Sequence, residues 1–248
     1  MADDIVHVSC FKWGDLYSAD DVNRLRAMFA RHLTRLHVFH CVTDNPQGLH
    51  PHIVTHSLPD YSFAPRDIGL GRKLAVYMPD FIGLEGQLLV QTDIDVVLVG
   101  NVDFLFDRPE VDFMIARGRN QSGNTRGHGA VVRLRVGALP TLWQDLLADP
   151  EGTAAHCQHH RGAPGHVSEQ RYLDWKLAEM AFFEDGRVVY FRQDCNAYAE
   201  TVNPTGHAIP PHGARIVSFA GRVKPQMVMN GPYDTCRHAP FVAQHWVE

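Results

Sequence analysis

The sequence predicts an α/β fold, a mainly parallel sheet flanked by helices, and two observations lead to it. A strand, a helix and a second strand follow one another within the first 43 residues, which is the order of a parallel βαβ unit. A strongly apolar strand later in the chain is typical of a strand buried on both faces. No repeat, low-complexity tract or linker divides the 248 residues. We therefore expect one domain over residues 1–248, with an irregular C-terminal segment wrapped on the sheet.

The N-terminal elements are indicated by their patterns. The apolar run Ile5–Cys10 predicts the first strand, and Val38–Thr43 predicts the second. Between them, Ser18 followed three residues later by Asp21 is the pattern of a helix start. The helix that follows places four apolar residues on one face, namely Val22, Leu25, Phe29 and Leu33.

Further elements follow along the chain. Strands are expected at Gln87–Gln91, Val96–Val99, Phe113–Ala116, Ala130–Leu134, Val188–Phe191 and Arg215–Phe219. Helices are expected at Arg72–Phe81, Leu139–Leu147 and Glu169–Phe183. The glycine-bearing segments Gly118–Gly129 and Pro150–Val167 are expected to be irregular.

The composition excludes several classes of protein. The chain has 23 basic and 28 acidic residues, a net charge of −5, and lacks the basic stripe of a nucleic-acid-binding protein. Its five cysteines are widely spaced and form no CxxC pair, which argues against a disulfide framework or a structural zinc site. The sequence shows no signal peptide and no apolar run of membrane-spanning length. We expect a soluble, cytoplasmic protein whose oligomeric state the sequence leaves open.

Sixteen histidines are an unusually large number for this length and invite a metal hypothesis. Four of them cluster at spacings that a zinc site on a helix would allow, namely His156, His159, His160 and His166. The neighbouring glycines and prolines favour a polar loop instead. We expect most of the histidines to lie on the surface and in loops.

The sharpest chemical feature is the pair Asp93 and Asp95, directly after the apolar strand. Residues two apart on an extended backbone project the same way, and the carboxyl ends of strands in open α/β sheets are where ligands bind. Two carboxylates at such a place suit Mg²⁺ or Mn²⁺ bridging a diphosphate. The alternative is a solvated turn with two unrelated acids.

Four segments together carry a resemblance to a known family. Leu89–Asn101 resembles the DxD segment of nucleotide-sugar glycosyltransferases with the GT-A fold, and in particular that of family 8. Phe11–Tyr17 and Val42–Asp44, after the first two strands, resemble the nucleotide-binding edge of that fold. Ser218–Pro225 is similar to the family's HxxGxxKP signature. The order and spacing match over residues 5–225.

The resemblance implies a glycosyltransferase that moves a sugar from a nucleotide-sugar donor, a UDP-sugar, to a hydroxyl of a glycan or small acceptor. Residues 1–110 would form the nucleotide-binding half, and residues 111–248 the half for acceptor and sugar. Asp93 and Asp95 would hold Mn²⁺ or Mg²⁺, and Lys224 would contact the diphosphate. The donor-binding residues implied in this way are Phe11, Lys12, Tyr17, Thr43, Asp44, Lys73, Asp93, Ile94, Asp95, Gly221 and Lys224. For the aromatic residues, ordinary core packing is an equally good interpretation.

Glu169 and Gln170 occupy the place of the family's acid–glutamine pair and are the candidate catalytic residues. By this similarity they would line the sugar pocket, with Glu169 as nucleophile, base or charge stabiliser, and with retention or inversion left open. The alternative is that Glu169 simply favours a helix start. His128 lies in a stretch that corresponds to one near the sugar and is a weaker candidate.

The chain departs from the family at one metal ligand. The signature opens with a histidine, where this chain has Ser218, and Ala220 stands where some related sequences carry that histidine. Three outcomes follow: weaker cation binding completed by water, a ligand from elsewhere such as His207 or His212, or loss of metal dependence. We favour the first.

Two other functions remain open. A haloacid-dehalogenase-like phosphohydrolase also uses a DxD after a strand, but its motif normally follows the first strand and needs a later acidic pair that this chain lacks. A non-catalytic nucleotide-sugar-binding module is the second alternative, and the missing histidine keeps it open.

Overall fold

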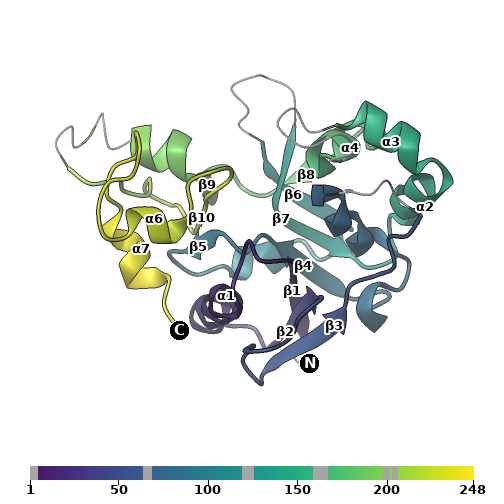
Figure 1. The fold of residues 1–248 in the computed structure, drawn as a ribbon, viewed down its shortest axis with the longest axis horizontal. Helices are drawn as coiled ribbons and strands as arrows, with labels where there is room; N and C mark the ends of the chain where they lie inside the picture. The colour runs from purple at the N-terminus through teal and green to yellow at the C-terminus, as the bar shows by residue number, and fades with distance from the viewer. Residues whose placement is uncertain (1–4, 64–68, 119–125, 159–166, 198–201, 203–205) are drawn as a thin grey trace.

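The computed structural model describes residues 5–63, 69–118, 126–158, 167–197, 202 and 206–248. A large twisted sheet of seven strands forms the centre of the molecule (Figure 1). In spatial order the strands are β3 (Ile53–Ser57), β2 (His37–Thr43), β1 (Val6–Lys12), β4 (Leu88–Thr92), β7 (Gly127–Arg135), β6 (Phe113–Arg117) and β8 (Ala181–Phe182).

The pairing within this sheet is mainly parallel, as the sequence predicts. β1 pairs in parallel with β2 on one side and with β4 on the other, and β2 pairs in parallel with β3. Only β7 runs against its neighbours β4 and β6, and β8 pairs in parallel with β6. The carboxyl ends of β1 and β4 therefore meet at one edge of the sheet, and this edge carries the candidate site.

Helices cover both faces of the sheet. α1 (Ala19–His32) begins at Ser18, which forms the predicted capping box with Asp21. α2 (Pro140–Ala148), α3 (Pro150–His156) and α4 (Glu169–Lys176) gather on the right of Figure 1. Two adjacent residues of β4 belong to separate apolar cores. Val90 packs in the core that includes α1, whereas Leu89 packs in the core that includes α2 and α4. This burial of both faces explains the continuous apolar run of β4.

A smaller sheet extends the fold on the other side. β5 (Val96–Leu98) pairs antiparallel with β10 (Ile216–Ser218), which pairs in parallel with β9 (Val188–Tyr190). Short helices complete this region, on the left of Figure 1: η4 (Phe191–Asn196), α6 (Pro225–Val228) and α7 (Pro240–His245). The C-terminal segment is thus more ordered than expected. No helix in the described ranges is long and apolar enough to cross a membrane.

Several sequence-based boundaries are wrong for identifiable reasons. α3 forms at the start of Pro150–Val167, where irregular chain is expected, because Asp149 caps its N-terminus. α4 ends at Lys176 rather than Phe183, since the chain turns there toward β8. β3 escapes prediction because only Ile53 of its five residues is buried. The predicted helix Arg72–Phe81 is a 3₁₀ helix, η1 (Gly69–Tyr77), followed by a second short one, η2 (Phe81–Gly83).

The histidines are not confined to surface and loops. His7, His40 and His56, on β1, β2 and β3, form a row across the sheet with ring nitrogens 3.0 Å apart at both contacts. His40, in the middle, is buried. Of the predicted loop cluster, His156 ends α3 and stacks on Trp175, whereas its other members, His159, His160 and His166, lie outside the described residues.

Candidate functional site

A cavity of about 510 Å³ lies where β1 and β4 end. Residues from the β1 end, η1, the β4 end, the start of α4 and the segment before α6 meet there, although they are far apart in the sequence. They are Phe11, Trp13, Leu16, Tyr17, Lys73, Thr92, Asp93, Ile94, Asp95, His128, Glu169, Gln170, Ala220, Gly221 and Lys224. A volume of this size suits a small organic ligand with a few polar anchors.

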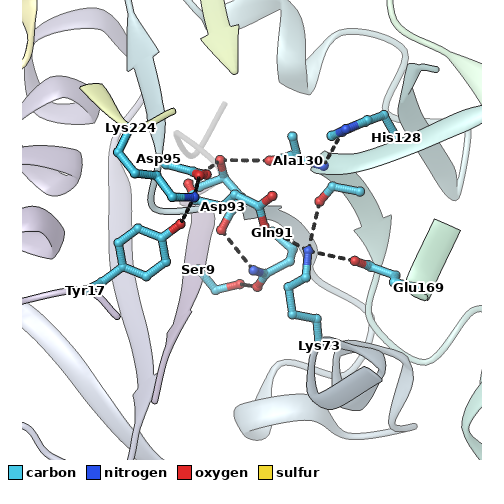
Figure 2. A network of polar contacts seen from close by, with 12 residues as sticks. Ser9, Tyr17, Lys73, Gln91, Asp93, Asp95, His128, Ala130, Glu169 and Lys224 are labelled. Atoms are coloured by element: carbon cyan, nitrogen blue, oxygen red, sulfur yellow. Dashed lines mark hydrogen bonds and ion pairs between the residues drawn. The ribbon is translucent and has the colours of Figure 1, made fainter. Parts of the chain in front are cut away.

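One side of the cavity is organised by Lys73, which comes from η1. Its Nζ lies 2.8 Å from Asp93 Oδ1 and 2.7 Å from Glu169 Oε2. Figure 2 shows the lysine between these two carboxylates. Burial alone would lower the pKa of Lys73, but the two carboxylates outweigh it and raise that pKa. The lysine therefore remains charged, and it fixes Asp93 and Glu169 relative to each other.

The other side is organised by Lys224, which directly precedes α6. Its Nζ forms a short ion pair with Asp95 Oδ2 and donates a hydrogen bond of 2.9 Å to the hydroxyl of Tyr17 (Figure 2). Burial, strengthened by the nearby Asp95, raises the pKa of Tyr17, so the phenol keeps its proton. Each carboxylate of the DxD pair thus has a lysine of its own.

Burial also acts on the two acids deepest in the site. The side chains of Asp95 and Glu169 are 6% and 3% exposed. Loss of solvent, together with Asp93 nearby, raises the pKa of both, while Lys224 and Lys73 oppose the rise for Asp95 and Glu169 respectively. The lysines therefore limit how far burial raises the pKa of these two acids.

Glu169 is held tightly at the start of α4. Its Oε2 binds Lys73, whereas its Oε1 is buried with no hydrogen-bond partner in the described part of the chain. Gly129 on β7 leaves room for it, because a Cβ at that position would lie 2.5 Å from Glu169 Oε2. An unpartnered buried carboxylate oxygen is costly unless a ligand satisfies it. The position of Glu169 at the N-terminus of α4 agrees with a catalytic role and equally with a role in stabilising the start of the helix.

His128 reaches the cavity from the beginning of β7. Its Nδ1 accepts a hydrogen bond of 3.1 Å from the backbone N–H of Ala130, so the proton of the neutral ring lies on Nε2. Burial lowers the pKa of His128 to about 4; Asp93 raises that pKa and Lys73 lowers it. At neutral pH His128 is thus an uncharged hydrogen-bond donor in the cavity wall.

The fold is shared with solved glycosyltransferase structures. The galactosyltransferase LgtC, solved with donor and acceptor sugar analogues, is 11% identical, with 89% of each chain covered and a TM-score of 0.59. The glycosyltransferase GlyE of Streptococcus pneumoniae TIGR4 is 14% identical over 90% of this chain and 56% of its own, with a TM-score of 0.58. Mouse xyloside xylosyltransferase 1 is 14% identical over 87% of this chain and 98% of its own, with a TM-score of 0.54.

The chain has the GT-A fold. The expected resemblance to family 8 glycosyltransferases is confirmed at this level of architecture. No family model and no curated protein matches the sequence. At these identities the likeness describes the backbone, so the roles of individual side chains rest on the contacts above.

Most of the predicted site residues of this GT-A chain line the cavity, and three do not. Asp44 instead accepts a hydrogen bond of 2.9 Å from the N–H of Gly14, and Thr43 accepts one of 3.1 Å from the N–H of Asn45. Both side chains hold turns near the β1 and β2 ends. Lys12 is buried in β1 but does not line the cavity.

Sequence reasoning missed other lining residues. Trp13 and Leu16 belong to the segment between β1 and α1, and Thr92 ends β4. Leu16 is exposed despite being apolar, and Trp13 is only partly buried. A large apolar side chain at the carboxyl end of a strand was the available signal, because such positions border the ligand site of α/β sheets.

The side chains of the cavity offer the type of ligand atom that a divalent cation prefers, but too few of these ligands. Asp93 and Asp95 offer carboxylate oxygens, which Mg²⁺ and Mn²⁺ prefer. No group of three His, Cys, Asp or Glu side chains suited to a metal occurs among the described residues. Ser218 is buried, and its hydroxyl has no hydrogen-bond partner within the part of the chain that the structure describes. His207 and His212 are exposed and do not line the cavity. The residues fit a cation for which another molecule supplies further ligands.

Proposed function

We propose that this protein is a glycosyltransferase that transfers a sugar from a nucleotide-sugar donor, a UDP-sugar, to a hydroxyl of a glycan or small acceptor. The observation that carries the proposal is the meeting of the DxD carboxylates, two lysines and Glu169–Gln170 in one cavity at the carboxyl ends of β1 and β4. The GT-A fold supports it, because its relatives in structure include glycosyltransferases.

In this proposal the cavity binds the donor along its length. Lys224 contacts the diphosphate, because it is a cation in the cavity lining beside the DxD pair. Gly221 also lines the cavity, with a φ of +95° that an L side chain rarely adopts. Tyr17 and Phe11 border the nucleotide end. Mn²⁺ or Mg²⁺ held by Asp93 and Asp95 would neutralise charge on the departing diphosphate.

Glu169 and Gln170 would face the sugar. Among the described residues that line the cavity, Glu169 is the one carboxylate outside the DxD pair, and its ion pair with Lys73 orients it. A fixed carboxylate can stabilise the positive charge that develops on the anomeric carbon, attack that carbon, or take a proton from the acceptor. His128 would donate a hydrogen bond from Nε2 to a sugar hydroxyl.

Release of UDP from a panel of UDP-sugars, with Mn²⁺ present, tests the proposal. We expect one sugar to be turned over, slowly with water and faster with an acceptor. Asp93→Ala and Asp95→Ala should abolish this release, because losing a group that stabilises developing charge costs about 10²–10³-fold in rate. Thermal unfolding of both variants controls for misfolding. Full activity in both would contradict the proposal.

The same assay separates the two alternatives. Nucleotide-sugar binding without turnover, with or without acceptors, would indicate a binding module. Release of phosphate from a sugar monophosphate, with no turnover of any UDP-sugar, would indicate a phosphohydrolase.

A further inference from the structure

Two buried polar atoms, one on η1 and one on α4, have no hydrogen-bond partner in the described part of the chain. The first is the hydroxyl of Tyr77, the last residue of η1, which is 1% exposed. The second is Oε1 of Glu169, whose other oxygen binds Lys73. Buried polar atoms without a partner are costly and rare in folded proteins. The pair therefore calls for an explanation.

The two atoms belong to elements that pack against each other. η1 contacts α4, and Tyr77 lies in the same apolar core as Tyr172 and Leu173 of α4. Burial raises the pKa of Tyr77 far above its usual range, and the charge of Glu169 raises it further. The phenol therefore keeps its proton and remains a hydrogen-bond donor. A donor and an acceptor, both without a partner, thus lie at the same contact between η1 and α4.

A second tyrosine of this core shows how a buried hydroxyl is normally accommodated. Tyr172 donates a hydrogen bond of 2.6 Å to the carbonyl oxygen of Leu142. Tyr77 contributes an apolar ring to the same core, but its hydroxyl has no such bond among the described residues. A phenylalanine would fill the core equally well without burying a polar atom. Packing alone does not account for the hydroxyl of Tyr77.

The carboxylate of Glu169 is held through only one of its oxygens. Lys73 lies 2.7 Å from Oε2. Gly129 backs the carboxylate closely, because a Cβ at that position would lie 2.5 Å from Oε2 and 3.3 Å from Oε1. A hydrogen bond at Oε1 would fix the plane of the carboxylate as well as its position. A group that acts on a reacting carbon needs both to be fixed.

We infer that Tyr77 is a positioning residue of Glu169: its hydroxyl donates a hydrogen bond toward Oε1, while Lys73 holds Oε2. A small rotation of the carboxylate, or one bridging water, joins the two atoms. Tyr77 does not line the cavity, so it acts through Glu169 and not on the donor itself. The catalytic part of this role rests on the proposed function, since Glu169 would face the sugar.

The first measurement needs no substrate. Urea denaturation compares Tyr77→Phe, Glu169→Gln and the double variant with the wild type in a double-mutant cycle. We expect Tyr77→Phe to lower the free energy of unfolding, and to lower it about half as far in the Glu169→Gln background, because a hydrogen bond to a charged acceptor is roughly twice as strong as a neutral one. A hydroxyl without a partner predicts the opposite sign, since its removal would stabilise the protein.

The second measurement separates positioning from a purely structural role. In the UDP-release assay with acceptor, Tyr77→Phe should lower kcat about 10-fold or more, because a displaced reacting group is costly. Its UDP affinity, measured by calorimetry, should stay at the wild-type value. Tyr172→Phe is the matched control, since it removes a buried hydroxyl from the same core. It should destabilise the protein equally in both backgrounds and leave kcat near the wild-type value.

The outcomes separate this inference from the proposed function. Additive effects of Tyr77→Phe and Glu169→Gln on stability, a more stable Tyr77→Phe, or an unchanged kcat in that variant overturns the inference and leaves a glycosyltransferase in place. Absence of turnover of every UDP-sugar by the wild type overturns the proposed function. The substrate-free cycle then still decides whether Tyr77 positions Glu169.

Discussion

Lys73 and Lys224 pair with the two carboxylates of one DxD motif, yet their surroundings differ. Lys73 is buried in η1 between two carboxylates, Asp93 and Glu169. Lys224 lies in the C-terminal segment and has one carboxylate partner, Asp95, beside the neutral hydroxyl of Tyr17. Lys73 is fixed by two carboxylates, whereas Lys224 needs to break only one ion pair to bind an incoming anion. We therefore expect Lys73 to act mainly on the stability of the site and Lys224 mainly on ligand binding.

The largest expected effect comes from removing each lysine. Lys73→Met leaves the buried Glu169 and the partly exposed Asp93 without their counter-charge, and we expect the free energy of unfolding to fall by about 3–5 kcal/mol. Lys224→Met should cost less stability, because only Asp95 loses a charged partner, but it should weaken UDP binding more. Urea denaturation and calorimetric UDP titration measure the two effects. Equal destabilisation by both variants would remove the distinction between the lysines.

The next effect isolates the position of Glu169 without changing a charge. In Gly129→Ala the new Cβ would lie 2.5 Å from Glu169 Oε2, so the carboxylate must move. We expect turnover of the preferred donor to fall by up to about 100-fold, since small displacements of a reacting group are costly. The matched control is Gly231→Ala, where a Cβ meets nothing within 4 Å. UDP affinity should stay near the wild-type value, which assigns the loss to the sugar side of the cavity.

A third prediction extends the comparison to the histidine row, where the titratable neighbours that lower the pKa of His40 are other histidines. Burial, followed by the neighbouring His7 and His56, lowers the pKa of His40 to about 3 from an ordinary value of 6.5. Between these values the unfolded chain binds the proton and the folded one does not. Stability from this group is therefore complete above pH 6.5 and is lost as the pH falls toward 3, at up to about 1.4 kcal/mol per pH unit.

Denaturation curves between pH 7 and pH 4 measure this loss. His40→Asn, which cannot take up the proton, should show a shallower dependence on pH than the wild type, even if it is less stable at pH 7. An unchanged slope would mean that other groups, and not the histidine row, control the acid sensitivity.

Much of the site was predictable because it follows strand ends. Asp93 and Asp95 are marked by the apolar strand before them, and Lys224 by the similarity of Ser218–Pro225 to a family signature. Which lysine meets which carboxylate was not predictable. The pairing of Lys73 with Glu169 joins residues 96 positions apart through the packing of η1 on α4. Local patterns carry no information about such contacts.

Errors in the fold have the same origin. β3 carries almost no apolar signal, because it is an edge strand with one buried residue and is defined by its pairing with β2. The histidine row also depends on pairing, since His7, His40 and His56 become neighbours only when three parallel strands align. Thr43 and Asp44, which the resemblance assigns to the donor, do not line the cavity, and their hydrogen bonds hold turns.

The sequence by itself determined the α/β class, the positions of the main strands along the chain, and the position of the DxD carboxylates at the end of a buried strand. These features depend on the pattern of apolar residues and on residue spacing, both of which can be read from short stretches of the sequence. Only the tertiary structure decided that each carboxylate already has a lysine, that Glu169 keeps one oxygen without a partner, and that no third ligand stands beside Asp93 and Asp95 in the described residues. The physical reason is that charge compensation depends on distances across the fold, which the spacing of residues along the chain does not set.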